Sequence, residues 1–398
     1  MTAKIQKSLC LIFCLLLMPS LFWGCTPGPE AAEKPEGENP GIFTLTFLTI
    51  GKGDAFLLET PEAQTYLIDT GKAQDYIHIA RALKAKDIRH LDGIFLTHGH
   101  KDHAGGLSTL LQTFPTDRVY CWAEDRYSYQ EIHPEEIVNG FPAQLISPVC
   151  GQILDLGGVE AEVWLPPQPD SKNENNNSMV LMLTHGNNKF LLMGDAELRE
   201  EAQLMKSPMD LKARVLKLGH HGETDATSPA FLNRVQPEFG LIAGNQEENP
   251  DSMNEEIAHS LKERNIRGIY SQSEGLGYQF ISDGENLRME VLERKEFPKN
   301  LNLRFGEVRR REQWLSVRNA GSEQADLSGC LIRSVKKDEM FVLPEGTLLS
   351  PGEEIIISCR DSDVPGDLTW DQDSVWQETG DEARLYDSSL NKLDVNKP

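Results

Sequence analysis

The stretch Thr97-His-Gly-His-Lys-Asp-His-Ala-Gly-Gly106 decides how this chain is interpreted. It contains four candidate metal ligands within six positions: His98, His100, Asp102 and His103. Imidazole nitrogens and carboxylate oxygens are the ligands that borderline divalent metals prefer, and four of them can serve two neighbouring ions. The apolar run Gly93-Ile-Phe-Leu96 precedes the stretch and predicts a buried strand, so the ligands are expected on a loop at its end. This pattern predicts a metal-dependent hydrolase.

Two later motifs also place candidate ligands directly after apolar runs. Asp195 lies in Leu192-Met-Gly-Asp-Ala-Glu197, and His220 and His221 lie in Lys217-Leu-Gly-His-His-Gly222. A lone Gly-Asp or His-His pair is more often structural, but three strand ends in this order favour ligands. We therefore expect the three motifs to meet at one edge of the sheets and to form one metal centre.

The spacing of apolar residues predicts a layered α/β domain followed by a second, all-β domain. Strand-like runs at 42–48 and 55–58 and a helical pattern at 74–86 begin an alternation of strands and helices that continues to about residue 290. Beyond about residue 297, short strands are separated by Gly, Pro, Ser and Asp turns, as in an immunoglobulin-like sandwich of about 100 residues. The expected domains are 41–292 and 298–398.

The formal net charge of −23 limits the kinds of substrate that fit the whole surface. Because the overall field repels phosphate, a nucleic-acid substrate needs a local cationic groove. The charge therefore argues against tight, sequence-independent DNA binding, but it allows turnover of a weakly held substrate.

The N-terminus has the layout of an export signal. Two lysines precede an apolar stretch at about 9–23, which is too short for a comfortable membrane span and ends at Gly24-Cys25. We expect a signal peptide over 1–25, lipidation of Cys25 and a flexible Pro- and Glu-rich linker over 26–40. Cleavage elsewhere and an uncleaved anchor are the alternatives. Each of these predicts an exported, extracytoplasmic protein, and lipidation would attach it to the membrane.

Cys330 and Cys359 lie within the expected second domain. An exported protein can form disulfides, so these two cysteines are a candidate pair. Buried free thiols in strands are an equally good interpretation.

The region from about 41 to 290 resembles the metallo-β-lactamase superfamily, whose mark is His-x-His-x-Asp-His with a later Asp and His. It is most similar to the hydrolase domain of ComEC/Rec2 competence proteins. The supporting segments are Gly51-Lys-Gly-Asp-Ala55, Leu67-Ile-Asp-Thr-Gly71, Asn175-Asn-Asn-Ser178, Gly194-Asp-Ala-Glu197 and Val215-Leu-Lys-Leu-Gly-His-His-Gly222. The resemblance implies an αββα sandwich that binds two divalent metal ions, Zn²⁺ or Mn²⁺.

The resemblance also implies a role for each site residue. One ion would be bound by His98 and His100 and the other by Asp102, His103 and either His220 or His221, of which we favour His221, with Asp195 bridging the two ions. His220 would contact a phosphoryl oxygen, and Asp102, Asp195 and His220 would take part in catalysis. Asp69, Asp54 and Asn175 would lie behind the ligands and support them. An ordinary turn carboxylate is an equally good interpretation of Asp54.

The sequence departs from the family pattern at two places. The superfamily usually has a histidine before the strand that leads to Asp195, whereas residues 174–178 read Glu-Asn-Asn-Asn-Ser. ComEC-like members share this loss, which leaves the His98/His100 site one strong ligand short. In addition, Asn245-Gln-Glu-Glu-Asn-Pro250 stands where ComEC-like domains often have Gly-His-Pro.

The C-terminal region resembles a lamin-tail domain. The supporting segments are Gln313-Trp-Leu-Ser-Val-Arg-Asn319, Asp326-Leu-Ser-Gly329, Leu343-Pro-Glu-Gly-Thr347, Leu349-Ser-Pro-Gly352 and Gly380-Asp-Glu-Ala-Arg-Leu-Tyr-Asp387. Cys330 replaces the tryptophan that usually follows Ser-Gly. The resemblance implies a binding or tethering role, with a cell-surface ligand as the expected partner.

Together, these features predict an exported phosphodiesterase or nuclease that acts on extracellular DNA through a metal-activated water. Hydrolysis of another ester, such as a phosphocholine ester, a lactone or a β-lactam, is the enzymatic alternative, since the fold alone does not choose a substrate. A non-catalytic surface lipoprotein that captures DNA is the third interpretation.

Overall fold

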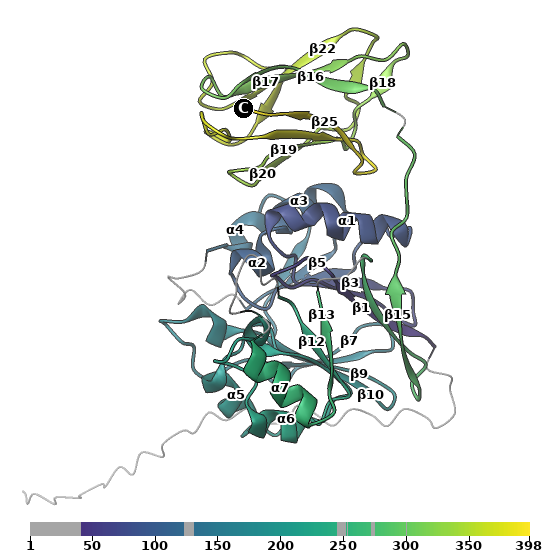
Figure 1. Cartoon of the computed structure of the whole chain (residues 1–398), viewed down its shortest axis with the longest axis vertical. Coiled ribbons are helices and arrows are strands. Elements are labelled where there is room, and N and C mark those ends of the chain that lie inside the picture. The colour runs from purple at the N-terminus through teal and green to yellow at the C-terminus, as the bar shows by residue number, and fades with distance from the viewer. Residues whose placement is uncertain (1–40, 123–130, 245–251, 253, 272–274, 300) are drawn as a thin grey trace, which may run out of the picture.

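A computed structural model describes residues 41–122, 131–244, 252, 254–271, 275–299 and 301–398. The chain forms a large body built on two sheets and a smaller all-β body above it (Figure 1). The expected signal and linker, Cys25 included, and the segment 245–250 lie outside the described residues. Within the described part of the chain, no helix has the length and apolarity needed to cross a membrane.

The first sheet of the large body has the strand order β15-β14-β1-β2-β3-β4-β5-β6. Its strands are β1 (Phe43–Leu48), β2 (Phe56–Glu59), β3 (Thr65–Ile68), β4 (Gly93–Phe95), β5 (Arg118–Tyr120), β6 (Gln144–Ile146), β14 (Gly277–Ser282) and β15 (Leu287–Leu292). The strands from β3 to β6 are parallel. His98 and His100 therefore lie on the loop that leaves the carboxyl end of β4, at the edge where parallel sheets commonly bind ligands.

The second sheet has the strand order β13-β12-β11-β10-β9-β8-β7. Its strands are β7 (Ile153–Asp155), β8 (Glu160–Trp164), β9 (Val180–His185), β10 (Asn188–Leu192), β11 (Val215–Lys217), β12 (Phe239–Ile242) and β13 (Arg267–Tyr270). Because β10 and β11 are parallel neighbours, the segments that follow them leave the sheet at the same edge. These segments carry Asp195 and the His220–His221 pair.

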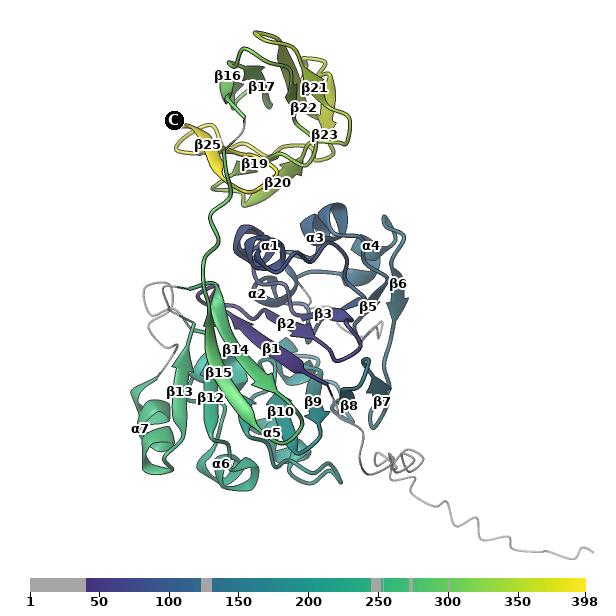
Figure 2. The ribbon, with the colours of Figure 1, turned by 90° about the vertical axis from the view of Figure 1, so that its right-hand side faces the viewer.

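The two sheets pack face to face, with helices on both outer faces (Figure 2). The first sheet is covered by α1 (Tyr76–Ala85), α2 (Lys101–Ala104), α3 (Leu107–Thr113) and α4 (Pro134–Val138), and the second by α5 (Leu198–Leu204), α6 (Pro229–Val235) and α7 (Glu255–Glu263). Alternate residues of β2 point to opposite faces: Phe56 packs between the sheets, whereas Leu57 packs under the helices. The αββα architecture predicted from the sequence is confirmed.

The smaller body is a β-sandwich. One sheet has the order β16-β17-β22-β23, the other β20-β19-β24-β25, and β18 pairs with β21. The bounds are β16 (Leu303–Arg309), β17 (Trp314–Asn319), β18 (Ala325–Asp326), β19 (Leu331–Ser334), β20 (Glu339–Val342), β21 (Leu348–Leu349), β22 (Glu354–Cys359), β23 (Leu368–Trp370), β24 (Ala383–Tyr386) and β25 (Lys392–Asn396). Cys330 and Cys359 are buried in its core as free thiols. The predicted all-β class is confirmed, and the lamin-tail resemblance stays a prediction.

The sandwich contacts the large body through α1 and the 3-10 helix η1 (Ala73–Asp75). The Arg81 guanidinium donates a hydrogen bond to the carbonyl of Leu390 at 2.8 Å. Arg333 donates to the side-chain oxygen of Gln74 at 2.8 Å, and the Gln74 N–H donates to Asp338 at 3.2 Å. Apolar side chains of the sandwich, among them Met340 and Leu390, also pack into the buried cluster that contains α1 and α3 side chains. Polar and apolar contacts together therefore hold the sandwich against the helices of the first sheet.

Candidate metal centre

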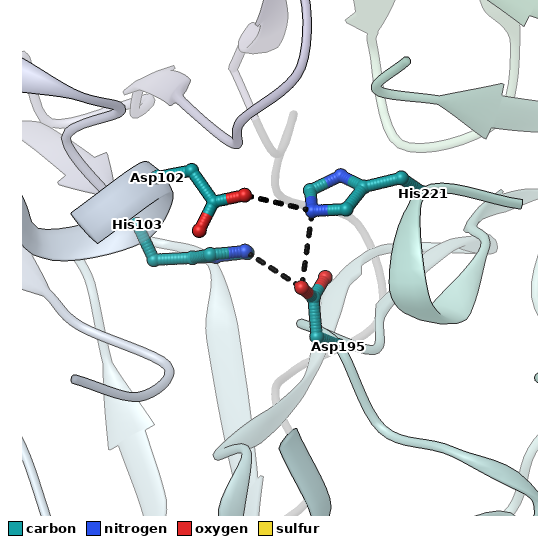
Figure 3. A group of neighbouring side chains, drawn as sticks. All are labelled: Asp102, His103, Asp195 and His221. Carbon is teal, nitrogen blue, oxygen red and sulfur yellow. Dashed lines mark ion pairs between the residues drawn. The ribbon is translucent and has the colours of Figure 1, made fainter. Parts of the chain in front are cut away.

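Four of the predicted ligands converge where the two sheets meet. Asp102 and His103 lie on α2, immediately after the loop from β4. Asp195 follows β10, and His221 lies in the 3-10 helix η3 (Gly219–Gly222) after β11. One ligand atom from each of the four side chains lies within 4.8 Å of the others. Each sheet thus supplies two of the four residues (Figure 3).

One oxygen of Asp195 lies at the middle of this group. Asp195 Oδ2 is 3.0 Å from Nε2 of His103 and 3.0 Å from Nε2 of His221. His221 Nε2 is also 3.3 Å from Oδ2 of Asp102. His103, Asp195 and His221 are buried, whereas the Asp102 side chain is 20% exposed. The dashed contacts of Figure 3 follow this arrangement.

The donor set fits a divalent metal ion. Nε2 of His103 and both ring nitrogens of His221 are buried and, among the described residues, have no partner with hydrogen-bond geometry. Buried polar atoms without partners are rare because they cost free energy, so such atoms point to an unseen ion or water. Two imidazole nitrogens and two carboxylates at this spacing form a set that Zn²⁺ or Mn²⁺ accepts.

Asp69 fixes the orientation of His103 from behind. Its Oδ2 is 2.7 Å from Nδ1 of His103, and its Oδ1 accepts the Thr97 N–H at 2.7 Å. The Thr97 hydroxyl donates to Asp69 at 2.8 Å and lies 3.1 Å from Nδ1 of His98. With a proton on Nδ1 of each histidine, the Nε2 lone pairs of His98 and His103 face the site. The support that the resemblance implies for Asp69 therefore has a geometric basis.

His98 and His100 form a pair beside the four-residue group. Nε2 of His98 lies 3.0 Å from Nδ1 of His100, so the two lone pairs can converge on one ion. In the described part of the chain, neither histidine belongs to a group of three or more potential ligands. Asn175, in the stretch where the superfamily usually has a histidine, donates from Nδ2 to Glu197 at 2.9 Å, and its Oδ1 is buried without a hydrogen-bond partner among the described residues.

His220 and His221 point to different surroundings. Nδ1 of His220 is 2.9 Å from Asp225, and its Nε2 is 3.3 Å from Nδ2 of Asn175. Both histidines have left-handed backbone conformations, with φ of 39° and 54°, which non-glycine residues seldom adopt. Strain of this kind is typical of functional sites, and here it places only His221 in the four-residue group.

The loop before β2 packs directly against the ligand helix α2. The Asp54 N–H donates to the carbonyl of Asp102 at 3.1 Å. Gly53 has a φ of +139°, and a Cβ there would lie 2.8 Å from that same carbonyl oxygen. A glycine is therefore required for this close approach.

The structure adds one residue that the sequence analysis did not single out, Lys217. Its side chain is fully buried at the end of β11, with Nζ 2.7 Å from Oδ2 of Asp54 and 3.2 Å from Oδ1 of Asp195. Asp54 is thus paired with a buried cation, and its Oδ1 lies 3.9 Å from Nδ1 of His221. A lysine inside an apolar strand was the signal in the sequence, because it must find a carboxylate when it is buried.

Burial and neighbouring charges shift the pKa values of the side chains in the cluster. Burial acts to lower the pKa of His103, but the carboxylates of Asp195 and Asp69 outweigh it and raise that pKa well above its usual value. Burial acts to raise the pKa of Asp195, but His103, His221 and Lys217 hold it well below its usual range. Burial and the neighbouring His103 lower the pKa of His98, which keeps this imidazole neutral, as a metal ligand must be.

Comparison with known proteins agrees with this geometry. Residues 48–244 match the model of the metallo-beta-lactamase superfamily. The chain therefore carries a metallo-beta-lactamase domain, and this domain together with the ligand cluster defines a metal-dependent hydrolase.

The curated relatives of this domain include competence proteins, and hydroxyacylglutathione hydrolases match shorter parts of it. ComE operon protein 3 of Bacillus subtilis (strain 168) is 26% identical over 251 residues, which are 58% of this chain and 32% of the relative. Competence protein ComA of Neisseria gonorrhoeae is 28% identical over 212 residues, 53% of this chain and 28% of the relative. Recombination protein 2 of Haemophilus influenzae is 28% identical over 201 residues, 49% of this chain and 23% of the relative. The chain thus spans about a third or less of the length of these relatives.

Among solved structures, the metallo-beta-lactamase fold protein YhfI from Bacillus subtilis is similar with a TM-score of 0.41 and 15% identity. The match covers 61% of this chain and 100% of YhfI.

Proposed function

We propose that this protein hydrolyses phosphodiester bonds at the cluster of Asp102, His103, Asp195 and His221. The observation that carries the proposal is the convergence of these four side chains from two sheets, with buried imidazole nitrogens that lack a hydrogen-bond partner among the described residues. A bound divalent ion activates a water molecule and stabilises the charge that develops on phosphoryl oxygens. The ion we propose is Zn²⁺ or Mn²⁺.

The residues in and around the cluster would have different roles in the reaction. Asp102, the most exposed of the four, would accept a proton from the attacking water, and Asp195 would hold the two sheets' ligands together through Oδ2. His220, held by Asp225 at 2.9 Å, would donate a hydrogen bond to a phosphoryl oxygen. The His98–His100 pair would take a second ion more weakly, because residues 174–178 provide no third histidine for its ligand set.

DNA is the substrate we propose first. Relatives of this domain are named competence and recombination proteins, and the matched regions are only 28% and 23% of the length of those two proteins. We further propose that the protein is exported and lipid-anchored through Cys25, so that the substrate would be extracellular. The C-terminal sandwich would then tether the enzyme or bind a cell-surface ligand, as the lamin-tail resemblance implies.

One observation favours a second candidate, hydrolysis of a small ester. Glu197, Glu223 and Asp225 surround His220 at the side of the cluster, with Nδ1 of His220 within 3.9 Å of each. An acidic rim repels a polyanion more than a small ester. A phosphocholine ester, a lactone or a β-lactam would meet less repulsion there.

The test is a substrate panel on residues 26–398, stripped of metal and reloaded with Zn²⁺ or Mn²⁺. The panel contains single-stranded DNA, duplex DNA, RNA, a phosphodiester reporter and a β-lactam. We expect metal-dependent phosphodiester cleavage that both His103→Ala and Asp195→Ala abolish while far-UV circular dichroism stays unchanged. Cleavage that survives both substitutions would exclude this site, and β-lactam turnover alone would support the second candidate.

A further inference from the structure

Lys217 places a fully buried ammonium group inside the metal centre. It is the last residue of β11, its side chain has no exposed surface, and His221 follows four positions later. Placing a charge in the protein interior is costly unless partners compensate for the lost water. A position of this kind therefore needs an explanation beyond packing.

All three donors of the Lys217 ammonium are used by the protein. Nζ donates to the carbonyl of Gly194 at 2.7 Å, to Oδ1 of Asp195 at 3.2 Å and to Oδ2 of Asp54 at 2.7 Å. An ammonium has three N–H donors, so none remains for water or substrate. Lys217 is thus suited to holding other side chains and not to binding a substrate.

The three acceptors come from both sheets. Asp54 lies in the loop between β1 and β2 of the first sheet, whereas Gly194 and Asp195 follow β10 of the second. Lys217 therefore bridges the sheets at the same edge that the metal ligands bridge. It also occupies Oδ1 of Asp195 and leaves Oδ2, which lies 3.0 Å from both His103 and His221, directed at the ligand cluster.

We propose that Lys217 is a positioning residue that assembles the metal centre before the ion arrives. It holds Asp195 so that Oδ2 alone faces the ion, and through Asp54 it fixes the loop that packs on α2. The inference rests on the proposed metal centre but not on any particular substrate. The cost of orienting Asp195 is then met during folding and not during metal binding.

A second effect of Lys217 has the opposite sign, and this makes the proposal testable. A fixed positive charge repels a divalent cation, so a lysine that acted only through its charge would weaken metal binding. Removing such a lysine would tighten binding. Removing a positioning lysine weakens binding, by about 10–100-fold for the loss of an outer partner.

The experiment compares metal-stripped wild-type protein with Lys217→Met, which keeps the length of the side chain and removes the ammonium. Lys189→Met is the matched control, because Lys189 lies on the neighbouring strand β10 and pairs with Asp210 at 2.9 Å away from the cluster. Co²⁺ affinity is measured by competition with a chelator, and the visible absorption of bound Co²⁺ reports the ligand geometry. Far-UV circular dichroism checks the metal-free fold.

We expect Lys217→Met to bind Co²⁺ about 10–100-fold more weakly with a changed absorption spectrum, and Lys189→Met to match the wild type. A folded Lys217→Met protein that binds Co²⁺ equally or more tightly overturns the proposal, as does an equal loss in Lys189→Met. If Lys217→Met does not fold, Asp54→Asn decides: a smaller loss with the same spectral change supports the proposal, and unchanged binding refutes it. Failure of the proposed function is a separate result, namely wild-type protein that binds Co²⁺ but cleaves no phosphodiester.

Discussion

Replacing Asp69 by asparagine exchanges one oxygen for an NH₂ group and is expected to disable both parts of the metal centre. In the wild type, Oδ1 accepts the Thr97 N–H at 2.7 Å, and Oδ2 interacts with the Thr97 hydroxyl at 2.8 Å and with Nδ1 of His103 at 2.7 Å. A backbone N–H can only donate, so the asparagine keeps its oxygen toward Thr97 N and places its NH₂ group where Oδ2 was. Nδ1 of His103 must then accept, and the ring proton moves to Nε2, the atom that faces Asp195.

The same exchange reaches His98 through Thr97. The Thr97 hydroxyl now accepts from the asparagine NH₂ and turns its own proton toward Nδ1 of His98, which is 3.1 Å away. Nε2 of His98 then carries the proton as well and has no lone pair for an ion. Losing an outer partner weakens metal binding by about 10–100-fold, or about 1.4–2.7 kcal/mol. Because two histidines are affected, we expect a loss at the upper end, about 100-fold.

Zn²⁺ affinity is measured by competition with a chromophoric chelator on metal-stripped protein. Asp326→Asn is the control, because Asp326 of the sandwich accepts the Ser328 N–H at 3.0 Å and the Ser328 hydroxyl at 2.6 Å. The control is expected to keep wild-type affinity. Wild-type affinity in a folded Asp69→Asn protein would refute the tautomer argument.

Three further predictions concern stability. Burial, and then the charge of Glu197, raise the pKa of Glu200 well above its usual value. Folding stability is therefore lost as pH rises above the unfolded-state pKa of about 4.3. The free energy of unfolding of Glu200→Gln should equal that of the wild type below this pH and exceed it above, by up to about 1.4 kcal/mol per pH unit. Urea unfolding at pH 4, 6 and 8 tests this, and equal stability of the two proteins at pH 8 would contradict it. Gly53→Ala, with φ at +139°, should cost about 1–3 kcal/mol and also weaken Zn²⁺ binding, as thermal unfolding with and without Zn²⁺ would reveal. Phe190→Ala, fully buried between the sheets, should cost about 3–5 kcal/mol in denaturant unfolding, and a loss below about 1 kcal/mol would argue against the packed core.

Much of the fold could be predicted from the period of the apolar residues. The alternation in 43–48 marks a strand, and the polar motifs after Leu96 and Leu192 mark strand ends, because ligands follow apolar runs there. Which strands become neighbours depends on contacts between distant segments. The pairing of β1 with β14, for example, depends on tertiary contacts, and the local pattern of residues 43–48 does not predict it.

The candidate metal ligands were easier to predict from the sequence than the residues that orient them. His103 and Asp195 belong to dense motifs, so their residue types and order were informative. Lys217 lies among apolar residues, and its partner Asp54 is far away in the chain, so only the packed sheets bring them together. The contact of His220 with Asp225 likewise depends on a left-handed backbone that the residue types do not predict.

The division of the four ligands between the sheets has a consequence for how the protein matures. Asp102 and His103 are synthesised well before Asp195 and His221, so neither sheet alone carries the complete four-residue cluster. The cluster is therefore complete only after β11 has joined its sheet and the two sheets have met. Full occupancy of this site by an ion would thus report that both halves of the domain have folded and packed together.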